Sequence, residues 1–310
     1  MAPDIEHLGI HESVSAVFPP EVLMQDLADT GPTVSVVGDD EIADLEAVVT
    51  FAHLDAYVEH LDWIHSIQAG YDRFPLDDLR ENDVLLTNST GIHGEAVGET
   101  VVGLMASIAR RLFTYVEAQS DNEWDAPPWD EPFTLFGEAV CVVGLGTLGQ
   151  GVAQRAAGFD MDVTGVRRTP TRVSHVPEVY TPSELHEAIE DARFVVLTVP
   201  LTDATAGMFG PEEFEAMRED AYLVNVARGS VVQEDALVEA LEAGNIAGAA
   251  LDVFEEEPLP RESPLWDMDE VLVTPHVAAR KRGYYEDIAR LVRENLRLIG
   301  ADEGPVNRIV

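Results

Sequence analysis

Residues 138–159 read EAVCVVGLGTLGQGVAQRAAGF, and this stretch decides the fold class. Its first part is a run of apolar residues that predicts a buried strand, and its alanine-rich second part predicts a helix. Between the two, Gly144, Gly146 and Gly149 match the pattern GxGxxG. In this pattern the first glycine allows a tight turn, the second lets backbone approach a pyrophosphate, and the third lets helix and strand pack closely. The stretch therefore predicts a dinucleotide-binding unit, with a glycine-rich turn that binds nothing as the alternative.

Short apolar runs alternate with stretches of helical spacing on both sides of this segment. TVSVV at residues 33–37 and VLLTN at 84–88 come before it, and DVTGV at 162–166 and VLVTPH at 271–276 come after it. Such alternation predicts parallel sheets with helices on both faces. We therefore expect an α/β protein of two doubly wound parallel-sheet domains. A Rossmann cofactor domain at residues 99–278 is inserted in a smaller, flavodoxin-like domain at residues 1–98 and 279–310.

Two neighbouring segments differ from this alternation. Residues 98–119 carry apolar side chains at spacings of three and four, which predicts one long helix with an apolar face. This face holds Val101, Leu104, Met105, Ile108, Leu112 and Val116. Residues 122–137 read NEWDAPPWDEPFTLFG, and the three prolines exclude a regular helix or central strand. We expect an extended arm there.

The chain is strongly acidic, with 58 acidic residues, 19 basic residues and a formal net charge of −39. Lys281 is its one lysine. At molar salt the Debye length falls to about 3 Å, so repulsion among surface carboxylates nearly vanishes. We therefore expect a haloarchaeal protein from a high-salt cytoplasm, with hydrated salt cations at its acidic surface. An acidic interaction tail or a DNA mimic is the alternative, although the acidic residues are spread along the whole chain.

The same composition argues against several classes of partner. Nucleic acids and anionic membranes need clustered lysine and arginine. No apolar run reaches the roughly 18 residues of a membrane span, and residues 1–13 lack the features of a secretory signal, so we expect a cytoplasmic protein.

A single cysteine, Cys141, excludes internal disulfide bonds. His53, His60 and His65 have spacings that fit no standard ligand pair on a helix, so we expect structural roles and no metal.

The residues that follow the second strand of the cofactor domain indicate which dinucleotide binds. NAD-binding domains usually place an acidic residue there for the ribose 2′-hydroxyl, whereas this chain has Arg167, Arg168 and Thr169. Two guanidinium groups and a hydroxyl can hold a 2′-phosphate through charge-assisted hydrogen bonds. We therefore expect NADP(H) to be preferred, with NAD(H) as the second candidate. A solvated basic turn is the alternative.

Residues 221–279 contain three further motifs: NxxRG with Arg228, a glutamate before proline at Glu257, and TPH ending at His276. With TNSTGIHGEAVGE at residues 87–99 and VPLT at 199–202, they resemble the D-isomer-specific 2-hydroxyacid dehydrogenase family over most of the chain. The resemblance implies an NAD(P)-dependent enzyme that interconverts a small 2-keto acid and its D-2-hydroxy acid. It also implies a homodimer, formed through the Val101 face and the arm. The alternative is a dinucleotide-sensing scaffold, similar to corepressors of the same superfamily, without physiological turnover.

The resemblance also assigns site residues. As the catalytic set, Arg228 binds substrate, His276 serves as general acid and base and also contacts substrate, and Glu257 orients the imidazole. The backbone of Ala69 and Gly70 would bind the substrate carboxylate, with an ordinary turn as the alternative. The expected cofactor contacts are Gly144, Gly146, Thr147, Leu148, Gly149, Arg167, Arg168, Thr169, Val199, Pro200, Thr205, Val226, Ala227 and Asp252.

Overall fold

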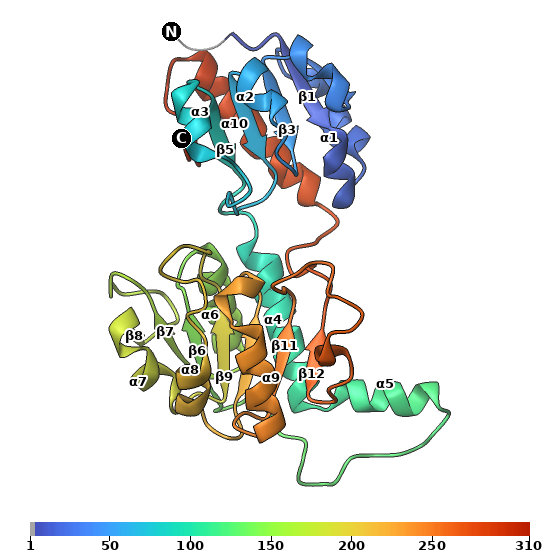
Figure 1. The fold of residues 1–310 in the computed structure, drawn as a ribbon, viewed down its shortest axis with the longest axis vertical. Helices are drawn as coiled ribbons and strands as arrows, with labels where there is room; N and C mark the ends of the chain where they lie inside the picture. Colours follow the sequence, from blue (N-terminus) through green and yellow to red (C-terminus); the bar gives the residue numbers. More distant parts are fainter. Residues whose placement is uncertain (1–3) are drawn as a thin grey trace. The chain divides into compact units, whose positions relative to one another are not determined.

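The computed structural model describes residues 4–310, which form two units with separate hydrophobic cores (Figure 1). The first unit holds the chain up to Ile92 together with Arg280–Val310, and the second holds His93–Ala279. The insertion of one α/β domain in another is thus confirmed. The first boundary differs from the expected 98/99, because the helix α4 (Gly94–Ala109) lies wholly in the second unit. Residues 1–3, which the sequence assigns to the flavodoxin-like domain, lie outside the described residues.

The first unit is built on a sheet of parallel strands in the order β2-β1-β3-β4-β5. Its strands are β1 (His7–His11), β2 (Thr33–Val37), β3 (Ala47–Thr50), β4 (Trp63–Ser66) and β5 (Leu85–Asn88), and its helices are α1 (Pro20–Asp26), α2 (Ala56–His60), α3 (Leu76–Glu81) and α10 (Tyr284–Gly300). Side chains of β3 alternate between two cores, with Val49 in a cluster that includes α1 and α10 and Val48 in one that includes α2 and α3. This strand order is that of a flavodoxin-like sheet, whose direction of growth reverses between β1 and β3.

The second unit has a larger parallel sheet in the order β12-β11-β10-β9-β6-β7-β8. Its strands are β6 (Ala139–Val143), β7 (Asp162–Val166), β8 (Glu178–Tyr180), β9 (Phe194–Leu197), β10 (Tyr222–Asn225), β11 (Gly248–Leu251) and β12 (Val271–Val273), and its further helices are α5 (Leu112–Ser120), α6 (Thr147–Gly158), α7 (Leu185–Ile189), α8 (Pro211–Ala216) and α9 (Glu234–Ala243). Counted from β6, this is the Rossmann order with one additional edge strand, and its reversal lies between β6 and β9.

The expectation of one long helix over residues 98–119 is wrong. The segment forms α4 and α5, and between them Arg111 has a left-handed backbone with φ of 53°. Met105 of α4 is buried in the core of the second unit, whereas Leu112 and Val116 of α5 are 46% and 61% exposed. The apolar face predicted from the sequence is therefore divided, because the left-handed residue changes the direction of the chain.

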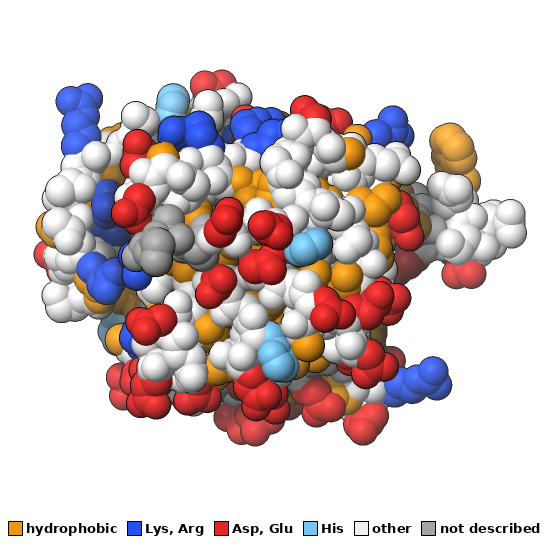
Figure 2. Space-filling view, turned by 90° about the horizontal axis from the view of Figure 1, so that it is seen from above, with side chains coloured by type: hydrophobic (Ala, Val, Ile, Leu, Met, Phe, Trp, Pro, Cys, Tyr) orange, Lys and Arg blue, Asp and Glu red, His pale blue; other side chains and the backbone are white. Residues whose placement is uncertain are grey.

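Residues 122–137 form neither helix nor strand, as their prolines predict. α5 and the first part of this segment protrude from the rest of the second unit (Figure 1), whereas Leu135 near its end is buried in the core. Trp124 and Trp129 in this arm are almost fully exposed. Acidic side chains are scattered over the face of the molecule that Figure 2 shows, rather than gathered in one patch. Within residues 4–310, none of the helices combines the length and apolar character needed to cross a bilayer.

Candidate active site

The turn between β6 and α6 has the backbone geometry that a pyrophosphate site needs. Gly144 has φ of 101°, a conformation that side-chain-bearing residues rarely adopt. A Cβ at Gly149 would lie 2.0 Å from the carbonyl oxygen of Gly144, so only glycine lets α6 pack against the turn. At Gly146, the N-cap of α6, a Cβ would meet no atom within 4 Å. Open space thus lies in front of a helix N-terminus, where phosphates bind well.

Thr147 and Leu148 begin α6 and are half-buried. The N–H groups in the first turn of a helix have no partner within the helix, so they are available to an anion. In the loop after β9, the Thr205 hydroxyl donates to the carbonyl of Pro200 at 2.6 Å and braces the segment that also contains Val199. This loop follows the strand next to β6, so both segments lie at the carboxyl edge of the sheet, where such folds bind dinucleotides.

Arg167, Arg168 and Thr169 directly follow β7 at the same edge. The Arg167 N–H donates to the carbonyl of Tyr180 at 3.0 Å, which continues the pairing of β7 with β8. Arg167 is half-buried, while Arg168 and Thr169 are exposed. Neither arginine forms an ion pair within residues 4–310. Two unpaired guanidinium groups in a chain of net charge −39 form a local anion-binding surface.

Arg228 lies in the turn that follows β10. Asn225, the last residue of that strand, holds the turn: its side chain accepts a bond from the Ala227 N–H at 3.0 Å and donates to the Arg228 carbonyl at 3.0 Å. Val226 and Ala227 are buried, whereas Arg228 is partly exposed. A Cβ at Gly229 would lie 1.8 Å from the carbonyl carbon of Phe254, so glycine is needed after the arginine.

His276 and Glu257 are in direct contact. Nδ1 of His276 lies 2.7 Å from Oε2 of Glu257, and the two side chains are 33% and 30% exposed. The other carboxylate oxygen of Glu257 accepts a bond from the Phe254 N–H at 3.2 Å, which fixes its orientation. Nε2 of His276 has no hydrogen-bond partner within the described part of the chain, so it is the ring nitrogen available for a further contact.

The three catalytic candidates follow neighbouring strands. Arg228 comes after β10, Glu257 after β11 and His276 after β12, and these strands are adjacent and parallel. Their carboxyl ends therefore share one edge of the sheet with the glycine-rich turn. Such an edge brings together an acid–base pair, a guanidinium and a dinucleotide site.

Asp252, expected among the cofactor contacts, has a different set of partners. It is 1% exposed, and its carboxylate accepts bonds from the N–H groups of Val277 and Ala278 at 2.9 Å each and from the Thr274 hydroxyl at 2.6 Å. Its carbonyl accepts a bond from the His276 N–H at 2.8 Å. Asp252 therefore anchors the loop that carries His276. The sequence signal for this role is an acidic residue directly after a fully apolar strand.

Ala69 and Gly70 lie in the loop after β4 of the first unit. The Asn88 side chain donates to the Ala69 carbonyl at 2.6 Å and holds the loop in place. Among residues 4–310, the N–H groups of Ala69 and Gly70 donate no backbone hydrogen bond. Two such N–H groups in a half-buried loop are suited to a carboxylate.

The three histidines considered for a metal site do not form one. In residues 4–310, there is no group of three or more histidine, cysteine or acidic side chains that could hold a metal ion. His65 is fully buried and bonds to the hydroxyls of Thr87 and Ser89. Burial also raises the pKa of the Cys141 thiol to about 12, which makes it unreactive.

Comparison with known proteins finds relatives of the chain. The sequence profile described as "D-isomer specific 2-hydroxyacid dehydrogenase, NAD binding domain" matches residues 102–278. The chain is 34% identical over 252 residues to the glyoxylate reductase of Pyrococcus horikoshii, covering 78% of this chain and 75% of that protein. It is 31% identical over 307 residues to glyoxylate/hydroxypyruvate reductase B of Shigella dysenteriae, covering 98% and 91% of the two chains.

Two solved structures extend the likeness to the whole fold. A D-isomer specific 2-hydroxyacid dehydrogenase from Xanthobacter autotrophicus Py2, in complex with NADPH and MES, is similar with a TM-score of 0.85 and 30% identity, over 99% of this chain and 98% of that one. An NADPH-dependent glyoxylate/hydroxypyruvate reductase from Sinorhizobium meliloti, in complex with NADP and sulfate, is similar with a TM-score of 0.83 and 25% identity, over 98% of each chain.

Proposed function

Since this chain belongs to the D-isomer-specific 2-hydroxyacid dehydrogenase family, which consists of NAD(P)-dependent oxidoreductases, we propose that it reduces glyoxylate and related small 2-keto acids. The observation that carries the proposal is the 2.7 Å contact between His276 and Glu257 at the sheet edge that also holds the glycine-rich turn. The relatives described above are named as reductases, which favours turnover over the alternative of a cofactor-sensing scaffold.

In this proposal, each site residue has a chemical task. When bound, the nicotinamide supplies the hydride for the keto carbon. The backbone N–H groups of Ala69 and Gly70 bind the substrate carboxylate, and the guanidinium of Arg228 binds and polarises the keto oxygen. His276 donates a proton from Nε2 to that oxygen during reduction and accepts it during oxidation. Glu257 keeps Nδ1 occupied, so the proton is exchanged at Nε2 alone.

The preferred cofactor in this proposal is NADP(H). Arg167, Arg168 and Thr169 occupy the position where NAD-binding domains carry an acidic residue, and neither arginine is paired within the described residues. Initial rates with glyoxylate, hydroxypyruvate and pyruvate, measured at molar salt with each cofactor, test the activity and the preference together. We expect kcat/KM to be at least about tenfold higher with NADPH than with NADH. A clear preference for NADH would contradict the assignment of the arginines.

A matched variant separates these arginines from the rest of the cofactor site. Replacing both Arg167 and Arg168 with Ala removes the groups assigned to the 2′-phosphate and leaves the glycine-rich turn unchanged. The KM for NADPH should rise about tenfold or more, while the KM for NADH stays the same. Equal changes in the KM values for the two cofactors would indicate that the arginines contribute to the stability of the protein rather than to binding of the 2′-phosphate.

The acidic surface supports adaptation to the high-salt cytoplasm of a haloarchaeon. The net charge of −39 is distributed over the surface, so stability should depend on screening and on hydrated cations. We expect the thermal midpoint to rise steeply when potassium chloride increases from millimolar to molar. An unchanged midpoint at low salt would show that the charge has another role.

We also propose that two copies form a homodimer through the arm and α5. Val116, Trp124 and Trp129 are exposed in a chain whose other apolar side chains are mostly buried, and exposed apolar patches commonly mark interaction surfaces. Light scattering in molar salt should give twice the mass of one chain. A monomer under these conditions would contradict the proposal.

A further inference from the structure

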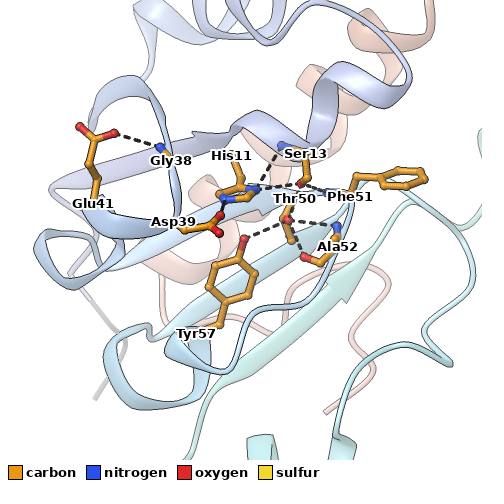
Figure 3. Close-up of polar contacts among 9 residues, drawn as sticks. All are labelled: His11, Ser13, Gly38, Asp39, Glu41, Thr50, Phe51, Ala52 and Tyr57. Atoms are coloured by element: carbon orange, nitrogen blue, oxygen red, sulfur yellow. Dashed lines mark hydrogen bonds and ion pairs between the residues drawn. The ribbon is translucent and has the colours of Figure 1, made fainter.

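A network of polar side chains lies where the sheet of the first unit reverses. His11 ends β1 and Thr50 ends β3, the two strands on either side of the reversal. His11 contacts Asp39 through Nε2 at 2.9 Å and Ser13 through Nδ1 at 2.9 Å, and Ser13 contacts Thr50 at 3.1 Å (Figure 3). Doubly wound sheets bind ligands at the carboxyl ends of strands beside such a reversal.

This network holds the loop that follows β3. The Ser13 N–H donates to Nδ1 of His11 at 3.2 Å, so Nδ1 is an acceptor and the ring proton lies on Nε2, directed at Asp39. The hydroxyl of Ser13 accepts a bond from the Phe51 N–H at 3.1 Å, and the hydroxyl of Thr50 donates to the Ala52 carbonyl at 2.6 Å. The backbone that presents Phe51 is therefore held by two hydroxyl groups.

The ring of Phe51 points away from this network (Figure 3). A guanidinium group lies over the face of this ring. The guanidinium carbon of Arg73 lies 5.4 Å from the centre of the ring. Arg73 belongs to the loop after β4, three residues beyond Gly70, so it shares that loop with the proposed carboxylate site. Stacking on an aromatic face holds a guanidinium in place without using its N–H donors.

Arg73 differs from two arginines of the first unit that are paired with acidic residues. Arg80 contacts Asp77 at 2.7 Å and Arg293 contacts Asp26 at 2.6 Å. Within residues 4–310, Arg73 forms no ion pair, although acidic residues outnumber basic ones 58 to 19 in this chain. An exposed guanidinium, held by stacking and with its donors unused, is suited to an anionic ligand.

We propose that Arg73 binds a second carboxylate of the substrate, so that the enzyme prefers 2-keto acids with an acidic side chain. This inference rests on the proposed function and names the substrate class of the same site. The N–H groups of Ala69 and Gly70 receive the carboxylate next to the keto group, and Arg73 receives the distal one. Two anion-binding points on one loop match a dianion, and the planar fork of a guanidinium matches a carboxylate.

The test compares two keto acids of equal chain length. 2-Oxoglutarate carries a distal carboxylate, and 2-oxopentanoate has a methyl group in its place. Initial rates with NADPH are measured for both acids and for glyoxylate at one fixed salt concentration. We expect the unmodified enzyme to have a higher kcat/KM for 2-oxoglutarate than for 2-oxopentanoate. Arg73→Gln should lower the value for 2-oxoglutarate about tenfold, mainly through KM, and leave the other two acids unchanged.

Two further variants complete the design. Arg80→Gln makes the same change of charge in the same unit and should leave all three substrates unchanged. Phe51→Leu removes the stacking surface and should reduce the preference for 2-oxoglutarate by a smaller factor. Thermal melts of each variant identify any loss of folding.

The outcomes separate this inference from the proposed function. Equal effects of Arg73→Gln on all three acids, or no effect on any, would overturn the role of Arg73. Good turnover of glyoxylate without preference for the dicarboxylic acid would overturn the substrate class and leave the proposed function in place. An absence of turnover with every keto acid would contradict the proposed function itself.

Discussion

His276 follows a strand of one parallel sheet, and His65 lies within a strand of the other. The surroundings of the two imidazole rings differ. His276 lies in the loop after β12, is about one-third exposed and bonds to a carboxylate. His65 lies inside β4, is fully buried and bonds only to hydroxyl groups. A loop at the carboxyl edge leaves one ring nitrogen accessible, whereas a position within a buried strand encloses both. The comparison shows that placement along the strand, rather than residue type, separates chemistry from structure.

Both ring nitrogens of His65 contact hydroxyl groups, and neither contacts a carboxylate within residues 4–310. The Ser89 hydroxyl donates to the Ser66 carbonyl at 3.0 Å, so it accepts a proton from Nε2 of His65. The Thr87 hydroxyl accepts a bond from the indole of Trp63 at 2.9 Å and lies 2.8 Å from Nδ1 of His65. Burial lowers the pKa of His65 to about 3, because the charged ring would lose its hydration without gaining a carboxylate partner.

The largest effect is expected where the exposed histidine is removed. His276→Asn deletes the proton donor, and kcat for glyoxylate reduction should fall about 10³-fold. Binding of NADPH, followed by fluorescence, and the thermal midpoint should stay close to those of the unmodified protein, because His276 is not part of the core. Near-normal turnover would show that another group supplies the proton.

Replacement of Glu257, the carboxylate beside His276, should have the next largest effect on kcat. Glu257→Gln retains the shape of the side chain and removes its charge, so Nδ1 of the imidazole loses the carboxylate that fixes its orientation. We expect kcat to fall about 10²-fold with little change in the KM for glyoxylate. Glu257→Asp, which keeps the charge, should recover part of the loss. A rise in KM and a loss of stability without an effect on kcat would indicate a structural role instead.

A variant of Asp252 tests whether the loop that contains His276 must be held in place. Asp252→Asn replaces an acceptor oxygen with an amide group that faces backbone N–H donors, which should destabilise the protein by about 1–3 kcal/mol. We expect kcat to fall about tenfold, because His276 loses its fixed position. The KM for NADPH should stay unchanged, and a large increase in it would instead support the cofactor role expected from the sequence. Urea unfolding and initial rates measure both effects.

For the buried histidine we expect no effect on turnover at neutral pH but an effect on stability that depends on pH. The pKa of His65 in the folded protein is about 3, below the unfolded value near 6.5, so its contribution is present above pH 6.5 and is lost as pH falls toward 3. The loss amounts to about 1.4 kcal/mol per pH unit in that window. His65→Gln lacks this titration, so the stability gap between the two proteins should shrink by that amount per unit below pH 6.5. Parallel stability curves from urea unfolding would contradict this.

Much of the fold and part of the site could be predicted from local patterns. The glycines of residues 144–149 predict a turn and a helix start, because their role depends on the backbone nearby. The NxxRG and TPH motifs indicated Arg228 and His276 through their resemblance to a known family. The prolines of residues 122–137 excluded regular structure without any knowledge of the neighbours.

Other features depend on residues that are distant in the sequence. The break at Arg111 divides a helix whose apolar spacing continues through it, and no local signal marks a left-handed arginine. Asp252 acts on a loop more than twenty residues later, so its contacts follow from the pairing of β11 with β12. The pairing of Arg73 with Phe51 joins loops after two neighbouring strands, which only the sheet brings together.

The sequence by itself determined the class of fold and the glycine-rich turn and supplied the candidates for the acid–base residues, because each depends on a short pattern of residue types. Tertiary structure decided which acidic residue supports the histidine loop, which histidine is enclosed and which arginine remains unpaired. These outcomes depend on strand order and burial, and the pairing of parallel strands joins segments that are far apart along the chain.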